Sequence, residues 1–449
     1  MRLTWAQPED LVPHEFVALR EEGVDTTEFE KVWVDAGGSL IPEVSGASAV
    51  AAPVERRVIA RKILHALQDV ESPARTEAIY APYRAAAIRE PRPISRADYE
   101  RRVAGAWHGR LVGCLLGKPV EKIPRQGVEE IARATGNWPI SSYFTAKGLP
   151  EEISVRWPWN RRSRPTSLKE NINGMPEDDD INYPLLALSL LEEKGPDFTS
   201  DDVVNLWLAN LSAGRVFTAE RAAYRNILDA RPVPESAIYI NPFREWIGAL
   251  IRADVFGWVN PGNEAKAAEM AWRDARVSHT RNGVYGEMWA AALTSSAMTA
   301  DSAEEAIERS LTVIPPTSLL AQAVRSGEQI GRDAGTLREG LDRLHADFGH
   351  YHWVHVLNNA ATISFALTVG KGDFTASIGA AVSAGWDTDS VGATVGSVAG
   401  ALGGTAKIDR AWTDPIHGFL RTSLPGMNEI HVSEVISRTI DLGERISHV

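Results

Sequence analysis

The interpretation of the whole chain rests on Ala384-Gly385-Trp386-Asp387-Thr388-Asp389-Ser390-Val391-Gly392, a stretch that runs on to Gly404. Two aspartates and a serine stand at the head of a segment that carries no charge from Ser390 to Ala406. This segment is too short and too rich in glycine to cross a membrane, which takes about 20 apolar residues. We therefore predict a buried helix whose first turn holds carboxylates. Since an isolated buried carboxylate is strongly destabilising, these acids need a cation or a metal ion as a partner.

A second glycine-rich helix is predicted to begin after Ser95, a favourable N-cap residue, and to end or kink before Pro119. Its glycines recur four residues apart, as do those of the first stretch. Each glycine inside a helix costs up to about 1 kcal/mol relative to alanine, so a stripe of them indicates that another backbone approaches closely. We predict that the two helices pack against each other or against a shared neighbour. The two stripes are Gly105, Gly109, Gly113 and Gly117, and Gly392, Gly396 and Gly400.

Four consecutive acids, Glu177-Asp178-Asp179-Asp180, open an apolar helical run that extends to Leu191. The helix dipole stabilises an acid at this end by only about 0.3–1 kcal/mol. Neighbouring unit charges near 4 Å repel by about 4 kcal/mol at an effective dielectric constant of 20. A hard divalent cation would convert this repulsion into binding. If this motif is considered alone, the alternative explanation is that its acids only stabilise the N-terminus of the helix.

If the two acidic helix starts converge, they supply four carboxylates and a hydroxyl. No cysteine or histidine lies among them, so this donor set suits one or two Mg²⁺, Mn²⁺ or Ca²⁺ ions rather than zinc. A pair of such ions can activate a water molecule or clamp substrate hydroxyls. The residues are Asp178, Asp179, Asp387, Asp389 and Ser390.

Composition places the chain among ordinary globular proteins, with 449 residues of which 44% are hydrophobic and 24% charged. The formal net charge of −12 argues against non-specific binding to nucleic acid or to an anionic membrane. A single cysteine, Cys114, excludes intramolecular disulfides and fits a reducing compartment. The first residues lack the apolar run of a signal peptide. We therefore expect a cytoplasmic protein; its oligomeric state is left open.

Helical patterns joined by short connections fill most of the chain, and strand-like alternation is nearly absent. We predict an all-α fold, a compact orthogonal assembly of helices. Residues 1–95 are predicted to form an N-terminal helical extension and residues 96–449 the main domain. The extension includes an amphipathic helix from Val54 to Val70. It serves as a stabilising appendage or as a lid or assembly surface.

Residues 137–173 form a long segment that is rich in Trp, Pro and Arg, including Arg156-Trp157-Pro158-Trp159-Asn160-Arg161-Arg162. Segments of this length without regular patterning are usually functional or disordered. Arginine and tryptophan can hold a phosphate and stack on a base. They can equally decorate a surface loop, and the sequence leaves both possibilities open.

These motifs, in this order, resemble the ADP-ribosylglycohydrolase family, which includes dinitrogenase reductase-activating glycohydrolases and ADP-ribosylarginine and ADP-ribosylserine hydrolases. The resemblance covers about residues 100–410. The glycine-spaced helix up to Glu121 is similar to the first helix of the family, although Cys114 stands where an aspartate is usual. Glu177-Asp178-Asp179-Asp180 resembles the Thr-Asp-Asp-Thr motif, and Gly385-Trp386-Asp387-Thr388-Asp389-Ser390 resembles Gly-Gly-Asp-Thr-Asp-Thr/Ser. Glu177 and Asp180 replace the flanking threonines.

The resemblance implies an all-α fold with two Mg²⁺ ions at the bottom of a cleft, where they would hold ribose hydroxyls and a water molecule. Catalytic roles would fall to Glu121, as acid or base at the anomeric carbon, and to Asp387. Ser278-His279 resembles a Thr/Ser-His pair near the ADP-ribose, and Gly248-Ala249 part of a diphosphate-binding turn. The implied metal ligands are Glu177, Asp178, Asp179, Asp387, Asp389 and Ser390.

The leading hypothesis is therefore Mg²⁺-dependent hydrolysis of the ribosyl C1 bond of an ADP-ribosylated protein or small molecule. Hydrolysis of free nucleosides or other N-ribosides on the same fold is a second hypothesis. A catalytically silent ADP-ribose-binding protein is a third, because Cys114, Glu177 and Asp180 depart from the family pattern. A class I terpene synthase also uses an aspartate-rich helix with Mg²⁺, but the stretch from Asp387 to Gly404 lacks the glutamate of the second motif of those enzymes.

Overall fold

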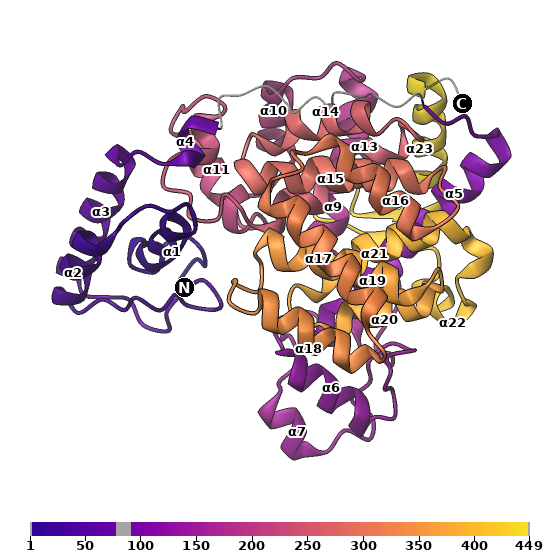
Figure 1. Ribbon diagram of the computed structural model, residues 1–449, viewed down its shortest axis with the longest axis horizontal. Helices are drawn as coiled ribbons and strands as arrows, with labels where there is room; N and C mark the ends of the chain where they lie inside the picture. Colours follow the sequence, from indigo (N-terminus) through magenta and orange to yellow (C-terminus); the bar gives the residue numbers. More distant parts are fainter. Residues whose placement is uncertain (1, 78–90, 448–449) are drawn as a thin grey trace.

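The computed structural model describes residues 2–77 and 91–447, and in this part of the chain helices predominate (Figure 1). The all-α prediction is confirmed. A two-stranded antiparallel sheet, which the sequence patterns did not predict, pairs β1 (Phe419–Arg421) with β2 (Glu429–His431). None of the helices in these residues combines the length and the apolar character that a membrane span requires.

The helices before the acidic motif include one long central helix and several short ones. They are α1 (Pro8–Glu21), α2 (Thr27–Asp35), α3 (Val54–Ala66), η1 (Leu67–Asp69), α4 (Pro73–Glu77), α5 (Arg96–Gly117), η2 (Lys118–Val120), α6 (Arg125–Ala134), α7 (Glu151–Arg156) and α8 (Arg164–Ser167).

The helices from the acidic motif onward form most of the compact body. They are α9 (Asp179–Lys194), α10 (Ser200–Asn210), α11 (Thr218–Leu228), α12 (Glu235–Ile238), η3 (Ile247–Arg252), α13 (Asp254–Trp258), α14 (Glu264–Ala275), α15 (Arg281–Ala297), α16 (Ala303–Ser310), η4 (Leu311–Val313), α17 (Leu319–Asp333), α18 (Leu337–Phe348), α19 (Val356–Gly370), α20 (Phe374–Ser383), α21 (Thr388–Gly403), η5 (Thr405–Lys407), α22 (Arg410–Thr413), η6 (Asp414–Ile416) and α23 (Val432–Ser447).

The two glycine-striped helices, α5 and α21, lie antiparallel in the core and are in direct backbone contact. A Cβ atom added to Gly105 would come well inside 3.0 Å of the carbonyl oxygen of Gly400, and one added to Gly113 would meet that of Gly392. The same holds in the reverse direction, since a Cβ on Gly396 would collide with the carbonyl of Gly109. The predicted contact between the two helices is confirmed. It requires glycine, because the Cβ atom of any other residue would collide with the facing backbone.

This pairing fixes where the two candidate site segments lie. Thr388 begins α21 and donates a hydrogen bond of 2.9 Å from its hydroxyl to the carbonyl oxygen of Gly117, the last residue of α5. The C-terminus of α5, which continues through η2 to Glu121, therefore meets the N-terminus of α21. The chain ends its helix before Pro119, as predicted.

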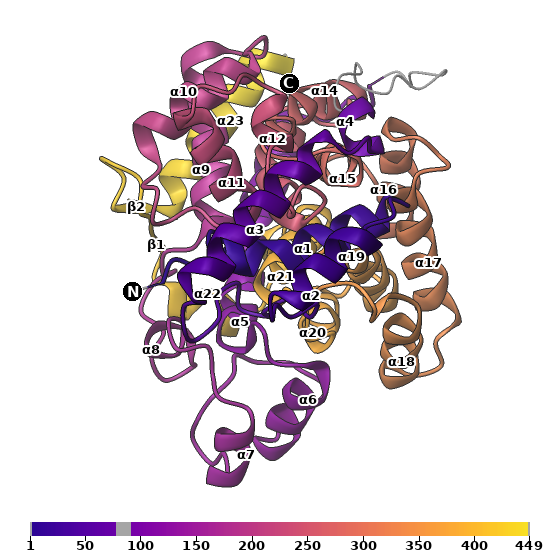
Figure 2. The same cartoon turned by 90° about the vertical axis from the view of Figure 1, so that its left-hand side faces the viewer.

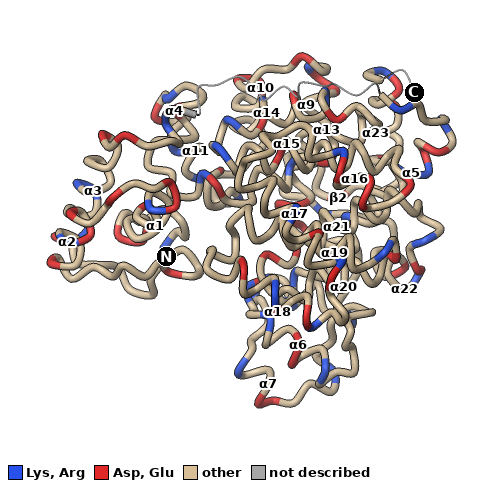
Figure 3. Tube along the Cα trace, viewed as in Figure 1, with Lys and Arg blue, Asp and Glu red and all other residues tan. Residues whose placement is uncertain are grey.

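The N-terminal helices α1 to α4 lie to one side of the main body (Figures 1 and 2). The buried guanidinium of Arg244 joins the two parts through Glu15 at 3.1 Å and Glu22 at 2.6 Å. Trp5 packs edge-on against Phe243, with ring centroids 5.4 Å apart. The helical content of this region agrees with the prediction, while the boundary at residues 95 and 96 stays a prediction. Basic and acidic residues are both scattered over the trace, so the net negative charge is not confined to one segment (Figure 3).

Candidate active site

Asp178, which the sequence marks as a metal ligand, sits directly before α9 and caps it. Its Oδ1 accepts a hydrogen bond of 2.9 Å from the backbone nitrogen of Asp180. Its Oδ2 forms an ion pair with the buried ammonium group of Lys118, which also donates to the carbonyl oxygen of Glu177 at 3.2 Å. Burial alone would raise the pKa of Asp178, but the Lys118 ammonium outweighs burial and the pKa is lowered. Asp178 is therefore an ionised carboxylate with a cation already bound.

Asp180 turns toward the core and joins two other elements. Its Oδ1 lies 3.4 Å from the guanidinium of Arg110 on α5, and its Oδ2 accepts a hydrogen bond of 3.2 Å from the hydroxyl of Ser390 on α21. Arg110 is fully buried and also forms an ion pair with Asp254 at 2.8 Å. Ser390 keeps its lone pairs free for a cation while it donates its proton. Asp180 thus locks α9 to both glycine-striped helices.

Asp179, Asp387 and Asp389 are carboxylates of the site for which the described residues provide no ion pair with a lysine, arginine or histidine. Burial raises the pKa of Asp179 well above its usual value, helped by the charges of Asp178 and Asp389. Burial also raises the pKa of Asp387, with Asp389 and Glu121 adding to the effect. For Asp389, burial, Glu121 and Asp178 raise the pKa to about 8. These mutual influences show that the two acidic helix starts converge, as predicted.

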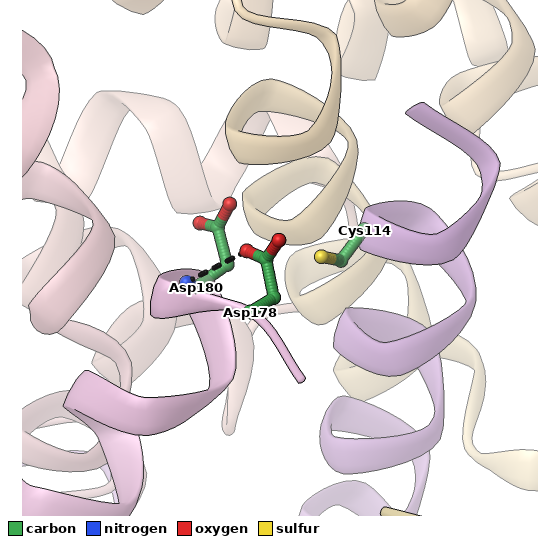
Figure 4. Close-up of side chains that lie close together, drawn as sticks. All are labelled: Cys114, Asp178 and Asp180. Atoms are coloured by element: carbon green, nitrogen blue, oxygen red, sulfur yellow. Dashed lines mark hydrogen bonds between the residues drawn. The ribbon is translucent and has the colours of Figure 1, made fainter. Parts of the chain in front are cut away.

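We refer to Asp178, Asp179, Asp180, Asp387 and Asp389 as the acidic cluster. Cys114 of α5 lies beside it, because its Sγ and one oxygen of each of Asp178 and Asp180 are all within 4.8 Å of one another (Figure 4). Burial and the two neighbouring carboxylates raise the pKa of Cys114 well above its usual value. The side chain is therefore a neutral thiol.

Glu121, the predicted catalytic acid or base, follows η2 and faces the same cluster. Its charge contributes to the raised pKa values of Asp387 and Asp389. Its Oε2 accepts a hydrogen bond of 2.5 Å from the side-chain amide of Asn160, and its Oε1 lies 3.4 Å from the ammonium of Lys122. Asn160 belongs to the segment 137–173, and its backbone nitrogen donates to the carbonyl oxygen of Pro119 at 2.9 Å. This segment therefore fixes the orientation of the glutamate.

The carboxylate of Glu177, in contrast, is directed away from the acidic cluster. Its Oε2 forms an ion pair of 2.9 Å with Arg215, and its Oε1 accepts a hydrogen bond of 3.1 Å from the side-chain amide of Asn182. The sequence offered no signal for this arrangement, because Arg215 lies in the connection between α10 and α11.

The predicted substrate-binding residues lie in a different neighbourhood. Gly248 and Ala249 are buried in η3, and a Cβ atom on Gly248 would collide with the carboxylate of Glu220. His279 is buried, and its Nδ1 lies 2.8 Å from the hydroxyl of Ser278. Burial, and then the nearby charge of Arg252, lower the pKa of His279 well below its usual value, so the ring is neutral. Their contact with a substrate stays a prediction.

The approach to Asp387 is shaped by Gly385 and Trp386. Gly385 has a φ of +72°, and a Cβ atom there would collide with the backbone of Arg125, so only glycine fits. Trp386 stacks on His345, with ring centroids 4.2 Å apart and an interplanar angle of 22°. Both residues line a cavity of about 810 Å³, together with Lys122, the neighbour of Glu121. The lining of this cavity thus includes the residues next in sequence to Glu121 and Asp387, but neither of these two carboxylates.

The acidic cluster meets the requirements of a divalent cation. Asp387 and Asp389 are buried carboxylates with raised pKa values, and the partly exposed Asp179, whose pKa is raised too, lies close enough to Asp389 to feel its charge. None of the three forms an ion pair with a basic side chain of the described residues, and the hydroxyl of Ser390 belongs to the same cluster. Oxygen donors of this kind suit Mg²⁺, Mn²⁺ or Ca²⁺. The identity and the number of ions are not fixed by this geometry.

Three residues that complete the site were not singled out from the sequence. Lys118 and Arg110 each form an ion pair with one aspartate of the cluster, and the side-chain amide of Asn160 donates a hydrogen bond to Glu121. Burial nevertheless raises the pKa of Asp180 well above its usual value. Arg110 and Cys114 lie four residues apart on α5, as Cys114 and Lys118 do across the end of that helix, so all three lie on the face that meets α9 and α21. That periodicity is the one signal in the sequence that pointed to them.

Comparison with protein families, curated sequences and solved structures bears on the family of this chain. The family model described as ADP-ribosylglycohydrolase matches residues 95–440. A solved structure titled "ADP-ribosylglycohydrolase-related protein complex" has a TM-score of 0.45 and 21% sequence identity, over 78% of this chain and 99% of that chain, a likeness too distant to support any argument about function. No curated protein sequence matches the chain. The family model covers most of the chain, which therefore belongs to the ADP-ribosylglycohydrolase family.

Proposed function

We propose that the protein is a divalent-metal-dependent hydrolase, with Mg²⁺ as the expected ion, that cleaves the ribosyl C1 glycosidic bond of an ADP-ribosylated substrate. The observation that carries this proposal is the convergence of Glu121 with the acidic cluster at the meeting point of α5, α9 and α21. Membership of a glycohydrolase family supports the hydrolytic class of reaction.

In this proposal Asp179, Asp387, Asp389 and Ser390 hold the cation, and Asp178 and Asp180 support them from the side of α9. A bound divalent cation would act as a Lewis acid on ribose hydroxyls and lower the pKa of a coordinated water. Glu121 exchanges a proton with the leaving group or with water at the anomeric carbon. Asn160 holds the Glu121 carboxylate in place for that step.

The cavity beside Glu121 is the proposed place of the leaving group. Its wall includes Lys122, Arg125 and Trp353 in addition to Gly385 and Trp386. A volume of about 810 Å³ lies within the usual range of small-molecule sites, roughly 300–1,000 Å³. We expect the ADP-ribosyl part of the substrate on the other side of the acidic cluster, toward His279 and Gly248.

The test is the release of ADP-ribose from proteins that carry arginine-linked or serine-linked ADP-ribose, by the purified full chain with and without Mg²⁺. We expect turnover only with the metal. Asp387→Ala should lose both metal binding and turnover, whereas substitution of the exposed Asp347 by alanine should leave both unchanged. Retention of metal and activity by Asp387→Ala would contradict the proposal.

Hydrolysis of a free N-riboside is the second candidate function. The observation that favours it is the hydrogen bond of Asn160 to Glu121, since the segment 137–173 thereby reaches the glutamate on the side where we expect the leaving group. A panel of nucleosides and N-ribosides, assayed beside the ADP-ribosylated proteins, separates the two functions. Tight binding of ADP-ribose without turnover of any substrate would instead indicate a silent binding protein.

A further inference from the structure

One cation of the site is supplied by the chain itself. The ammonium of Lys118 is bound to the carboxylate of Asp178, and the two side chains are only 7% and 9% exposed. Lys118 directly follows the end of α5, and its second contact is the backbone carbonyl of Glu177, 3.2 Å away. The ammonium is therefore held by both residues that open the acidic motif of α9.

The other donors on this side of the acidic cluster are already engaged or are poor ligands for a hard cation. The Glu177 carboxylate is bound to Arg215 and Asn182, and Asp180 to Arg110 and Ser390. Cys114, the remaining neighbour of Asp178, is a neutral thiol, and sulfur is a soft donor that Mg²⁺ and Ca²⁺ do not favour.

The rest of the acidic cluster has a different composition. Asp179, Asp387 and Asp389 are oxygen donors, and within the described residues none of them forms an ion pair with a basic side chain, although the Lys118 charge acts to lower the pKa values of Asp179 and Asp389. A divalent cation bound there gains three carboxylates. A divalent cation bound to Asp178 would instead lie beside a fixed positive charge in a site shielded from water, where like charges repel most strongly.

We propose that the Lys118 ammonium occupies the place of one divalent cation, so that the protein binds a single ion, on Asp179, Asp387 and Asp389. This differs from the two ions that the family resemblance implies. This inference adds the number of bound ions to the proposed function. It depends on the proposed function only because both take the acidic cluster as the metal site. Lys118 then acts as a positioning residue that keeps Asp178 ionised and excludes a second metal.

The experiment is a titration of the metal-free full chain with Mn²⁺, in which bound and free ions are counted by electron paramagnetic resonance and by calorimetry. We expect one Mn²⁺ per chain and the spectrum of an isolated ion. Two ions per chain with a spin-coupled spectrum would overturn the inference, whether or not the protein hydrolyses any substrate.

Substitutions of the lysine sharpen the test. Lys118→Met keeps the length of the side chain and removes its charge, so we expect the stoichiometry to rise from one to two ions. Lys118→Arg keeps the charge and should bind one ion. Lys122→Met, at the neighbouring lysine that contacts Glu121, is the matched control and should also bind one. A folded Lys118→Met protein that still binds one ion contradicts the inference.

The outcomes separate this inference from the proposed function. A chain that binds one Mn²⁺ but hydrolyses no ADP-ribosylated substrate and no N-riboside supports the role of Lys118 and contradicts the function. A chain that binds two ions and hydrolyses one of these substrates contradicts the role of Lys118 and supports the proposed function. If circular dichroism shows that Lys118→Met does not fold, the number of Mn²⁺ ions bound per chain is compared for the unmodified protein and for Lys118→Arg. One ion in both supports the inference, and two ions in either contradicts it.

Discussion

Single side chains decide the charge state of the site. Lys118 and Arg110 each form an ion pair with one aspartate of the acidic cluster, while Asp179, Asp387 and Asp389 form no ion pair with a basic side chain of the described residues. The difference follows from where the side chains start. Arg110 extends from α5 and Lys118 from η2 toward the first turn of α9, whereas no basic side chain of the described residues forms an ion pair with the aspartates at the start of α21.

The raised pKa of Asp389 predicts how metal binding depends on pH. With a pKa of about 8, Asp389 holds a proton in the metal-free protein below pH 8 and must release it to bind a cation. The apparent affinity for Mn²⁺ should therefore rise from pH 6 to pH 8, by about tenfold per pH unit for each proton released, and level off above pH 8. Calorimetry in buffers of different ionisation enthalpy measures both the affinity and the proton release.

The same shift fixes the sign of the stability change in the metal-free protein. Unfolded Asp389 ionises near its ordinary value of 3.8, so between about pH 4 and pH 8 the folded state binds more protons than the unfolded state. The free energy of unfolding should fall as pH rises through this window, and Asp389→Asn should flatten the fall. An affinity for Mn²⁺ that is independent of pH would contradict the assignment of Asp389 as a ligand.

Asn160 provides a second test at this scale. Asn160→Ala removes the hydrogen bond to Glu121 and should lower kcat by about tenfold, the effect of one lost hydrogen bond to a charged group of about 1.5 kcal/mol. KM and metal stoichiometry should change little. Asn171→Ala, which removes an exposed hydrogen bond to Arg164 in the same segment, is the matched control. An equal loss in both variants would show that Asn160 acts only on the stability of the segment.

At the scale of elements, the pairing of α5 with α21 holds the two halves of the site together. Each glycine of one stripe lies against a backbone carbonyl of the other helix, so the pair has no side chains that can yield at the contact. The hydroxyl of Thr388 then ties the end of α5 to the start of α21. A shift along this contact would separate Glu121 from Asp387.

Gly113→Ala tests this pairing. Its Cβ atom would overlap the carbonyl group of Gly392, and backbone cannot move aside as a flexible side chain does. We expect a loss of about 3 kcal/mol in the free energy of unfolding, together with weaker Mn²⁺ binding. Gly214→Ala, at a glycine whose nearest neighbour is 4.0 Å from an added Cβ atom, should change neither. Denaturant unfolding and Mn²⁺ titration of both variants make the comparison.

At the scale of the whole molecule, the N-terminal helices are joined to the main body through a buried charge. Arg244 lies between Glu15 and Glu22, and all three side chains are nearly inaccessible to solvent. Trp353 of the main body also donates to the carbonyl oxygen of Val44 at 3.0 Å, and both residues line the cavity beside the site. The N-terminal region therefore contributes to the wall of the proposed leaving-group site.

Arg244→Met should weaken this docking. Two buried carboxylates would lose their cation, which destabilises a protein by about 3–5 kcal/mol. We expect faster proteolysis within residues 2–77 than in the unmodified chain, while Mn²⁺ binding at the acidic cluster is retained. Arg20→Met, which removes an exposed ion pair with Glu30, should cost less than about 1 kcal/mol and leave proteolysis unchanged. Equal proteolysis of the two variants would contradict the role of Arg244.

The sequence by itself determined the helical class and the close backbone approach along each glycine stripe, because helical periodicity and glycine spacing are local patterns. That the two stripes meet each other, and that Asp178 and Asp179 converge with Asp387 and Asp389, were hypotheses that only packing could decide. The tertiary structure alone decided which carboxylates are neutralised. It placed Lys118 on Asp178, turned Glu177 to Arg215 and brought Asn160 to Glu121, since these partners lie on separate elements and only packing fixes their distances.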